Sequence, residues 1–157
     1  MLQFNNQGYL LPVDVIETDL VTFQEHFIFN EARQELFEAY LSFNHTLQKL
    51  IDADYQQWVN GSFTTKKVKP NDIDVVSFIP HTIFESLSKV FEEMYRNKHQ
   101  GKIDCFFVPS YPENHARYNH YQADQLDFWH KFVRDFKRER ITKKKHSKGF
   151  IQINFTK

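Results

Sequence analysis

The sequence has few of the residues that break or cross-link a chain. It contains 157 residues, of which 4 are Gly, 5 are Pro and one, Cys105, is cysteine. A lone cysteine excludes an internal disulfide and any zinc site built from several cysteines. No apolar run approaches the roughly 18–20 residues of a membrane-spanning helix. The first residues, 1–6, also lack the basic and long apolar segments of a signal peptide. We therefore expect a protein of the reducing cytoplasm with no membrane partner.

Hydrophobic residues are plentiful, at 41% of the chain, and 17 Phe supply much of their bulk. Burial of such side chains offsets the entropy that a chain loses when it becomes ordered. A chain of this length suits one domain with a real core. We therefore predict a single domain over residues 1–157, with Cys105 as a small core residue.

Charge is balanced in number but not along the chain, since Lys+Arg and Asp+Glu both total 20. Residues 1–60 hold nine acidic and two basic side chains, whereas residues 128–157 hold two acidic and ten basic ones. The simplest interpretation of the basic end is a solvated face. Two alternatives are contact with nucleic-acid phosphates and pairing with acidic helices of another copy or of a partner protein.

The hydrophobic pattern predicts helices first and then a small sheet with helices between its strands. Thr18 is the expected cap of a helix to about residue 26, and Asn30 of a longer one, so that helices occupy about residues 18–52. A capping box at residues 82–85 predicts a third helix, and a fourth spans about 119–138. Strands are expected at residues 55–59, 73–79, 102–108 and 150–155. The fold class is α/β or α+β, with a small mixed sheet of about four strands packed with helices.

Three carboxylates occupy positions that bring them together if two of these strands are neighbours. Asp72 and Asp74 are two residues apart, so they project from the same face of a strand. Asp104 stands in the otherwise apolar run of the next strand. The alternative for Asp72 and Asp74 is a turn cap followed by a solvent-facing strand position.

Clustered carboxylates repel one another unless a cation neutralises them. Oxygen ligands of this kind suit Mg²⁺ or Mn²⁺, which also take substrate phosphates and water as ligands. Gly61 and Ser62 follow a strand directly, where a tight turn and a hydroxyl can meet a phosphate. The lysines at positions 66, 67 and 69 lie in the same loop. This combination predicts phosphoryl or nucleotidyl transfer.

The order Gly61-Ser62, Asp72-Ile73-Asp74 and then Asp104 resembles the nucleotidyltransferase superfamily that includes DNA polymerase β. The chain more closely resembles a family of small, largely uncharacterised bacterial nucleotidyltransferase-like proteins. These are often encoded near mobile elements and toxin–antitoxin or phage-defence genes. The resemblance covers nearly the whole sequence. The matching segments are Gly8-Tyr9-Leu10-Leu11-Pro12, residues 58–63, Lys67, residues 70–76 and Lys148-Gly149-Phe150-Ile151.

The resemblance implies a minimal nucleotidyltransferase fold and assigns roles to individual residues. Asp72 and Asp74 would be metal ligands, with Asp104 as the third acid of the catalytic and metal-binding set. Gly61, Ser62 and Lys67 would bind the nucleotide. Many relatives carry Arg and a second Gly between Gly-Ser and the acid pair, whereas this chain has Phe63-Thr64-Thr65-Lys66-Lys67.

The first expected function is a Mg²⁺-dependent nucleotidyltransferase that moves a nucleotidyl group from an NTP, such as ATP, to a protein or RNA hydroxyl. The alternative is a weak or inactive nucleotidyltransferase-like module. It would act as an antitoxin or regulatory partner of a protein encoded by a neighbouring gene, in a toxin–antitoxin or phage-defence system. A third interpretation is an RNA-binding protein that uses only the basic end of the chain.

Overall fold

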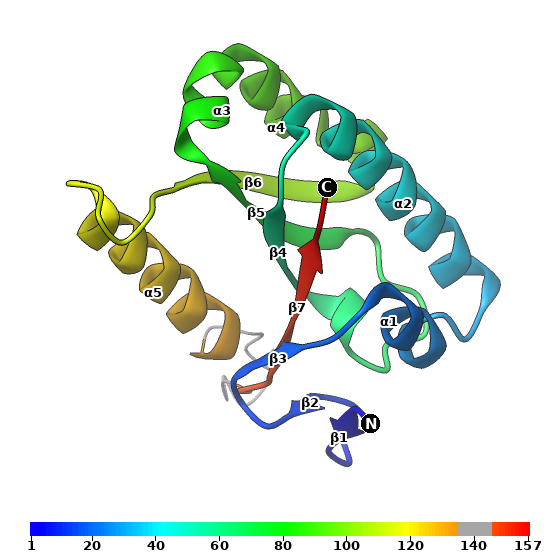
Figure 1. Ribbon diagram of the computed structural model, residues 1–157. Helices are drawn as coiled ribbons and strands as arrows, with labels where there is room; N and C mark the ends of the chain where they lie inside the picture. The colour runs from blue at the N-terminus through cyan, green and yellow to red at the C-terminus, as the bar shows by residue number, and fades with distance from the viewer. Residues whose placement is uncertain (135–145) are drawn as a thin grey trace.

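Five strands form a mixed sheet in the order β3-β7-β4-β5-β6 in the computed structural model, which describes residues 1–134 and 146–157 (Figure 1). Strand β5 is parallel to β6 and antiparallel to β4, while β7 is antiparallel to β4 and parallel to β3. The strands are β3 Val15–Glu17, β4 Tyr55–Asn60, β5 Ile73–Pro80, β6 Ile103–Ser110 and β7 Phe150–Phe155. The predicted α/β class is confirmed. A fifth strand exists because the short segment β3 pairs with the start of β7.

Helices cover both faces of this sheet (Figure 1). Residues of α1 to α4 join one buried cluster against the sheet, whereas α5 contributes to a separate cluster on the other face. A second, small sheet pairs β1 Gln3–Phe4 with β2 Leu10–Leu11. The helices are α1 Leu20–Phe27, α2 Glu31–Ile51, α3 His81–Ser86, α4 Ser88–Gly101 and α5 Tyr118–Arg134, and Ser62–Thr64 form a single 3₁₀ turn.

The starts of the helices confirm one predicted cap and correct two others. Asn30 caps α2, as its side-chain oxygen accepts the Arg33 N–H at 2.9 Å. Thr18 does not cap α1, because the carboxylate of Asp19 accepts the Thr22 N–H at 2.7 Å instead. The capping box at residues 82–85 is also wrong: α3 begins at His81, so these residues lie inside the helix. Pro80 ends β5 and leads into α3 without a side-chain cap.

Most predicted element boundaries are within two residues of the observed ones. Strand β7 has the predicted bounds, and β4 is one residue longer than predicted. Strand β6 begins one residue later and ends two residues later than predicted. Helix α5 begins one residue early, and the rest of its predicted length, 135–138, lies outside the described residues.

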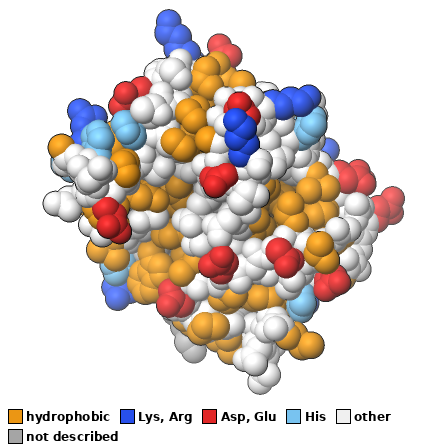
Figure 2. All heavy atoms as spheres, viewed as in Figure 1, with side chains coloured by type: hydrophobic (Ala, Val, Ile, Leu, Met, Phe, Trp, Pro, Cys, Tyr) orange, Lys and Arg blue, Asp and Glu red, His pale blue; other side chains and the backbone are white. Residues whose placement is uncertain are grey.

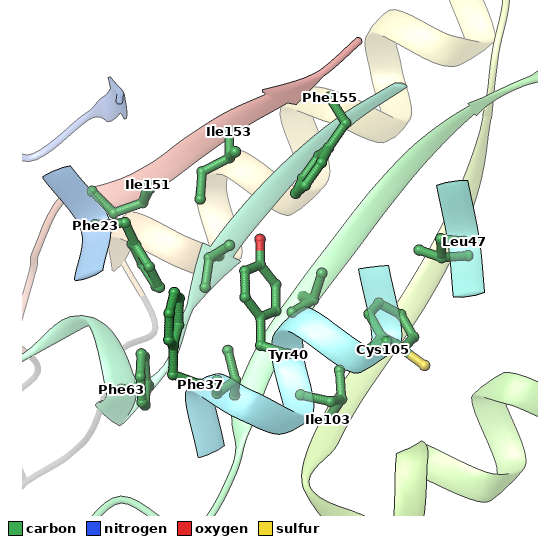
Figure 3. Close-up of a cluster of buried hydrophobic side chains, with 14 of the residues drawn as sticks. Phe23, Phe37, Tyr40, Leu47, Phe63, Ile103, Cys105, Ile151, Ile153 and Phe155 are labelled. Atoms are coloured by element: carbon green, nitrogen blue, oxygen red, sulfur yellow. The ribbon is translucent and has the colours of Figure 1, made fainter. Parts of the chain in front are cut away.

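The main core lies between the sheet and helices α1, α2 and α4 (Figure 3). Figure 3 shows side chains of α1 and α2, such as Phe23 and Tyr40, directed toward strand residues such as Ile151. Both helical side chains are fully buried. Cys105 is also fully buried there, which confirms its predicted role as a small core residue.

A polar network crosses the middle of this core. The Tyr40 hydroxyl donates to Gln57 Oε1 at 2.7 Å, and Gln57 Nε2 donates to Asn44 Oδ1 and Ser77 Oγ at 2.8 and 2.9 Å. Tyr55 donates to the same Asn44 oxygen at 3.0 Å. Every side chain in the network therefore has a partner, as burial of polar groups requires.

On the face shown in Figure 2, acidic side chains (red) are scattered among hydrophobic and uncharged ones. None of the helices in the described part of the chain is both long and apolar enough to cross a membrane.

Candidate functional site

The predicted carboxylates meet where the parallel strands β5 and β6 begin. The register of these strands pairs Asp74 with Asp104, and Asp72 directly precedes β5. Ile73 and Val75 alternate with Asp74 and join the main core. Asp74 therefore projects toward the face that α5 covers, together with Val76, its neighbour on that side of the strand. The neighbouring strands that the sequence argument required are present.

The carboxylates are close enough to change one another's acidity. Burial raises the pKa of Asp74 to about 7, and repulsion from Asp72 and Asp104 adds to this, as does a hydrogen bond with Asp104. Burial followed by repulsion from Asp104 also raises the pKa of Asp72, while Lys98 and Lys67 oppose the shift. The site holds negative charges together at a cost that a bound cation would relieve.

Gly61 forms a turn that lies directly against this cluster. Its φ of +78° and ψ of −164° belong to a region of backbone space that is essentially restricted to glycine. A Cβ atom at this position would overlap the Asp74 carboxylate, with its centre 2.9 Å from Asp74 Cγ. The missing side chain is what allows the turn and the carboxylate to lie together.

The turn and the acids line one cavity of about 420 Å³. Asp72, Asp74, Gly61, Ser62 and Lys67 contribute to its polar wall, so five of the six predicted site residues are brought together. Its remaining wall includes apolar and basic side chains of β6 and α5, namely Phe106, Lys131 and Phe132. Of the other loop lysines predicted to reach phosphates, Lys66 and Lys69 do not line this cavity.

Asp104 is the sixth predicted residue, and it does not line the cavity. Its Oδ1 atom lies 3.2 Å from Lys98 Nζ in an ion pair. Lys98 adopts a left-handed backbone conformation, as do His99 and Gln100 after it, at the end of the segment assigned to α4. An ammonium group therefore already compensates the third acid.

Lys148 is a site residue that the sequence argument grouped with the solvated basic end. Its side chain is fully buried, and Nζ donates to Asn60 Oδ1, to Thr64 Oγ1 at 2.8 Å and to the Gly149 carbonyl. Burial lowers its pKa to about 7, and attraction to Asp74 opposes that shift. Lys148 thus ties the start of β7 to both sides of the Gly61 turn. The signal available in the sequence was its spacing: Lys148 lies two residues before the apolar Phe150, which is buried, and residues two apart in an extended segment point to the same side.

Arg33 is a second fully buried cation that sequence reasoning missed. Its guanidinium donates to the carbonyls of Phe27, Phe63, Thr65 and Lys67 at distances between 2.6 and 2.9 Å. Burial lowers its pKa to about 10. Arg33 therefore fixes the backbone of the loop after the Gly61 turn through its hydrogen bonds to the loop carbonyls. Its place on the apolar stripe of α2, three residues before Leu36, was the available signal.

The residues present fit a hard divalent cation that needs only one or two carboxylate ligands from the protein. Among residues 1–134 and 146–157, no group of three or more His, Cys, Asp or Glu side chains could hold a metal ion. Mg²⁺ usually needs only one or two carboxylates, with substrate phosphates and water as the other ligands. Asp72 and Asp74 facing one polar cavity supply such a pair. Asp104 is engaged by Lys98 and contributes through its contact with Asp74.

Lys131 and Arg134 are on α5, while the lysines at positions 143–145 lie outside the described residues.

Comparison with known proteins identifies a family but not an activity. No curated protein and no solved structure matches the chain. A family model described as a family of unknown function (DUF6932) matches residues 2–154. Because this match spans nearly the whole sequence, the chain belongs to the DUF6932 family.

Proposed function

We propose that this protein is a minimal nucleotidyltransferase, which moves a nucleotidyl group from an NTP to a hydroxyl of a protein or RNA. The observation that carries the proposal is the contact between the Gly61 turn and the Asp74 carboxylate, inside a cavity that Asp72 and Ser62 also line. The resemblance to the nucleotidyltransferase superfamily supports the same proposal. The family model itself assigns no activity.

Each residue of the cavity has a defined task under this proposal. Asp72 and Asp74 hold Mg²⁺ or Mn²⁺, which when bound neutralises charge on the phosphates. Ser62 and Lys67 contact the phosphates of the nucleotide. The oxygen of the acceptor hydroxyl forms a bond to the α-phosphorus, and the bond to the leaving pyrophosphate breaks.

A proton must leave the acceptor hydroxyl during this exchange. One carboxylate of the cluster assists this deprotonation. Asp104 lies opposite Asp74 in the strand register and adds to the negative charge of the cluster. Lys148 and Arg33 hold the two sides of the turn and loop, so that the geometry exists before the nucleotide binds.

The test is transfer of label from α-³²P NTPs to candidate acceptors, with the wild type compared with Asp74→Asn. The matched control is Asp124→Asn, which makes the same change at an exposed position of α5. We expect labelling by the wild type and by Asp124→Asn, and at least about a 100-fold loss in Asp74→Asn. Equal labelling by all three proteins would contradict the assignment of the carboxylates.

The ion pair between Lys98 and Asp104 favours a second candidate, a catalytically silent module that acts as an antitoxin or regulatory partner. In this case the lysine substitutes for the cation that an active site would recruit. Thermal shift with ATP and Mg²⁺ separates the two. Stabilisation that is lost in Asp72→Asn/Asp74→Asn supports a working site. Absence of any shift, together with stable co-purification of a protein from a neighbouring gene, supports the module.

A further inference from the structure

A second polar pocket borders the loop that follows the Gly61 turn. It has a volume of about 550 Å³ and is lined by the N-terminal hairpin and by Ser62, Thr65, Lys66 and Lys67 of the loop. Ser62 and Lys67 also line the cavity of the acid pair. The two hollows are therefore adjacent, with Ser62 and Lys67 in the lining of both.

The hairpin is fixed to the loop by direct contacts. The Lys66 N–H donates to the Gly8 carbonyl at 3.0 Å, and Tyr9 forms a β-bridge with Thr65. Gly8 has a φ of +79°, and a Cβ atom there would lie 2.7 Å from the Cβ of Lys66. Asn5 shapes the hairpin by accepting the Tyr9 N–H at 3.0 Å on its side-chain oxygen. The pocket is thus a built feature of the fold.

The charge of the pocket is positive. Its lining includes Lys66, Lys67 and the amide side chains of Asn5, Asn6 and Gln7, and it contains no Asp or Glu. The buried guanidinium of Arg33 lies beneath the same loop, and after burial it is the second cause of a lowered pKa at Lys66.

These cations are not held in ion pairs with carboxylates of the described residues, although Lys67 acts electrostatically on Asp72. In the part of the chain that the structure describes, no Asp or Glu forms an ion pair with any of the three basic residues. Lys66 is held in place, since its Nζ donates to the His26 carbonyl at 3.1 Å and lies 4.2 Å from the centre of the Phe4 ring. A pocket with excess positive charge, amide donors and hydroxyl groups is suited to phosphate oxygens.

We propose that this pocket binds the terminal phosphates of the nucleoside triphosphate, while the acid pair faces its α-phosphate. The inference rests on the proposed function for the identity of the nucleotide. The affinity of the pocket for a free diphosphate does not depend on it. Lys67, which lines both hollows and acts electrostatically on Asp72, is the link between the two parts of the ligand.

The direct test measures binding of inorganic pyrophosphate by calorimetry in the presence of EDTA, so that no cation contributes at the acid pair. Gln7→Glu places a negative charge in the pocket with almost no change in size, at an exposed position where folding is not at risk. Lys67→Gln removes a positive charge. We expect each variant to weaken pyrophosphate binding by about tenfold or more.

The controls are Lys69→Gln, at an exposed lysine of the same loop that lines neither hollow, and Asp74→Asn. Both should bind pyrophosphate at least as tightly as the wild type. No binding by the wild type would overturn the proposal. So would binding that Gln7→Glu and Lys67→Gln leave unchanged, or binding that Asp74→Asn abolishes. Circular dichroism of each variant verifies that it is folded.

Nucleotide transfer separates this inference from the proposed function. If the pocket is correct and transfer occurs, Gln7→Glu raises the KM for ATP about tenfold and changes kcat little. Pyrophosphate binding without transfer would leave the pocket intact and contradict the proposed function. Transfer with an unchanged KM in Gln7→Glu would do the reverse.

Discussion

The two faces of the five-stranded sheet accommodate their polar side chains differently. On the face covered by α1 to α4, polar side chains such as Gln57 and Asn44 satisfy one another within an apolar core. On the face covered by α5, the carboxylates of Asp72 and Asp74 are instead held together with their pKa values raised. The first arrangement serves stability, whereas the second sacrifices stability to keep a charged cavity, as functional sites commonly do.

The largest expected effect on stability is at Phe23, which is fully buried among the rings of Phe27, Phe37, Tyr40 and Phe63. Phe23→Ala should lower the free energy of unfolding by about 3–5 kcal/mol, measured by urea denaturation. If the two faces are independent, the remaining folded protein should bind pyrophosphate as the wild type does. A change in that affinity of more than about threefold would contradict the independence.

Gly61→Ala tests the connection between the turn and the acids. The substitution puts a side chain where the Asp74 carboxylate lies and forces a non-glycine residue into a φ of +78°. We expect about 3 kcal/mol of destabilisation in urea and at least about a 100-fold loss of nucleotide transfer. The matched control is Gly101→Ala, where φ is also positive, at +80°, but no described residue beyond its own chain neighbours and helix backbone lies within 4 Å of the added methyl group. Equal loss of transfer in both variants would show that backbone strain alone is responsible.

Asp74→Asn should raise the free energy of unfolding, whereas Phe23→Ala and Gly61→Ala lower it. The folded protein retains the Asp74 proton to a pH of about 7, whereas an unfolded chain releases it near 3.8. Rising pH across this interval therefore destabilises the wild type, and the penalty is complete above pH 7. Relative to the wild type, the variant should gain stability at pH 8 and nothing from this source below pH 4. The difference between the two pKa values corresponds to about 4 kcal/mol, and the partial exposure of the carboxylate reduces the expected gain to on the order of 2 kcal/mol. Urea denaturation in EDTA across pH 4–8 measures the difference, and a constant difference would contradict the raised pKa.

The smallest expected effect is at the polar network of the opposite face. Tyr40→Phe removes the hydroxyl that donates to Gln57 Oε1 at 2.7 Å and leaves that buried oxygen without this donor. We expect a loss of about 1 kcal/mol in the free energy of unfolding. The loss should be independent of pH between 5 and 8, in contrast to the effect of Asp74→Asn. A pH-dependent loss would indicate that the two faces are electrostatically coupled.

The elements of the fold follow closely from local sequence patterns. The β-branched run of β5, the apolar stripe of α2 and the Asn30 cap each depend on residues near one another in the chain. The errors lie where several residues compete for the same local task. Thr18 and Asp19 are both residue types that cap helices well, and it is the Asp19 carboxylate that accepts the Thr22 N–H.

The candidate site was predictable in part for a related reason. Asp72 and Asp74 share a face because a strand alternates every two residues, and Gly61-Ser62 is recognisable as a turn. The buried cations Lys148 and Arg33 were not predicted, because lysine and arginine are usually exposed and only distant oxygen acceptors make their burial possible. Likewise, the ion pair of Lys98 with Asp104 depends on the left-handed turn that precedes β6.

By itself, the sequence determined the class of the fold, the buried Cys105 and the shared face of Asp72 and Asp74, since each depends on composition or on spacing within one segment. Tertiary structure alone decided that Asp104 pairs with Asp74 and that the N-terminal hairpin adds a cationic pocket to the loop. The physical reason is the register and packing of segments far apart in the chain. Both features depend on contacts between segments far apart in the chain, which offset the cost of bringing charged groups together. No local pattern encodes those contacts.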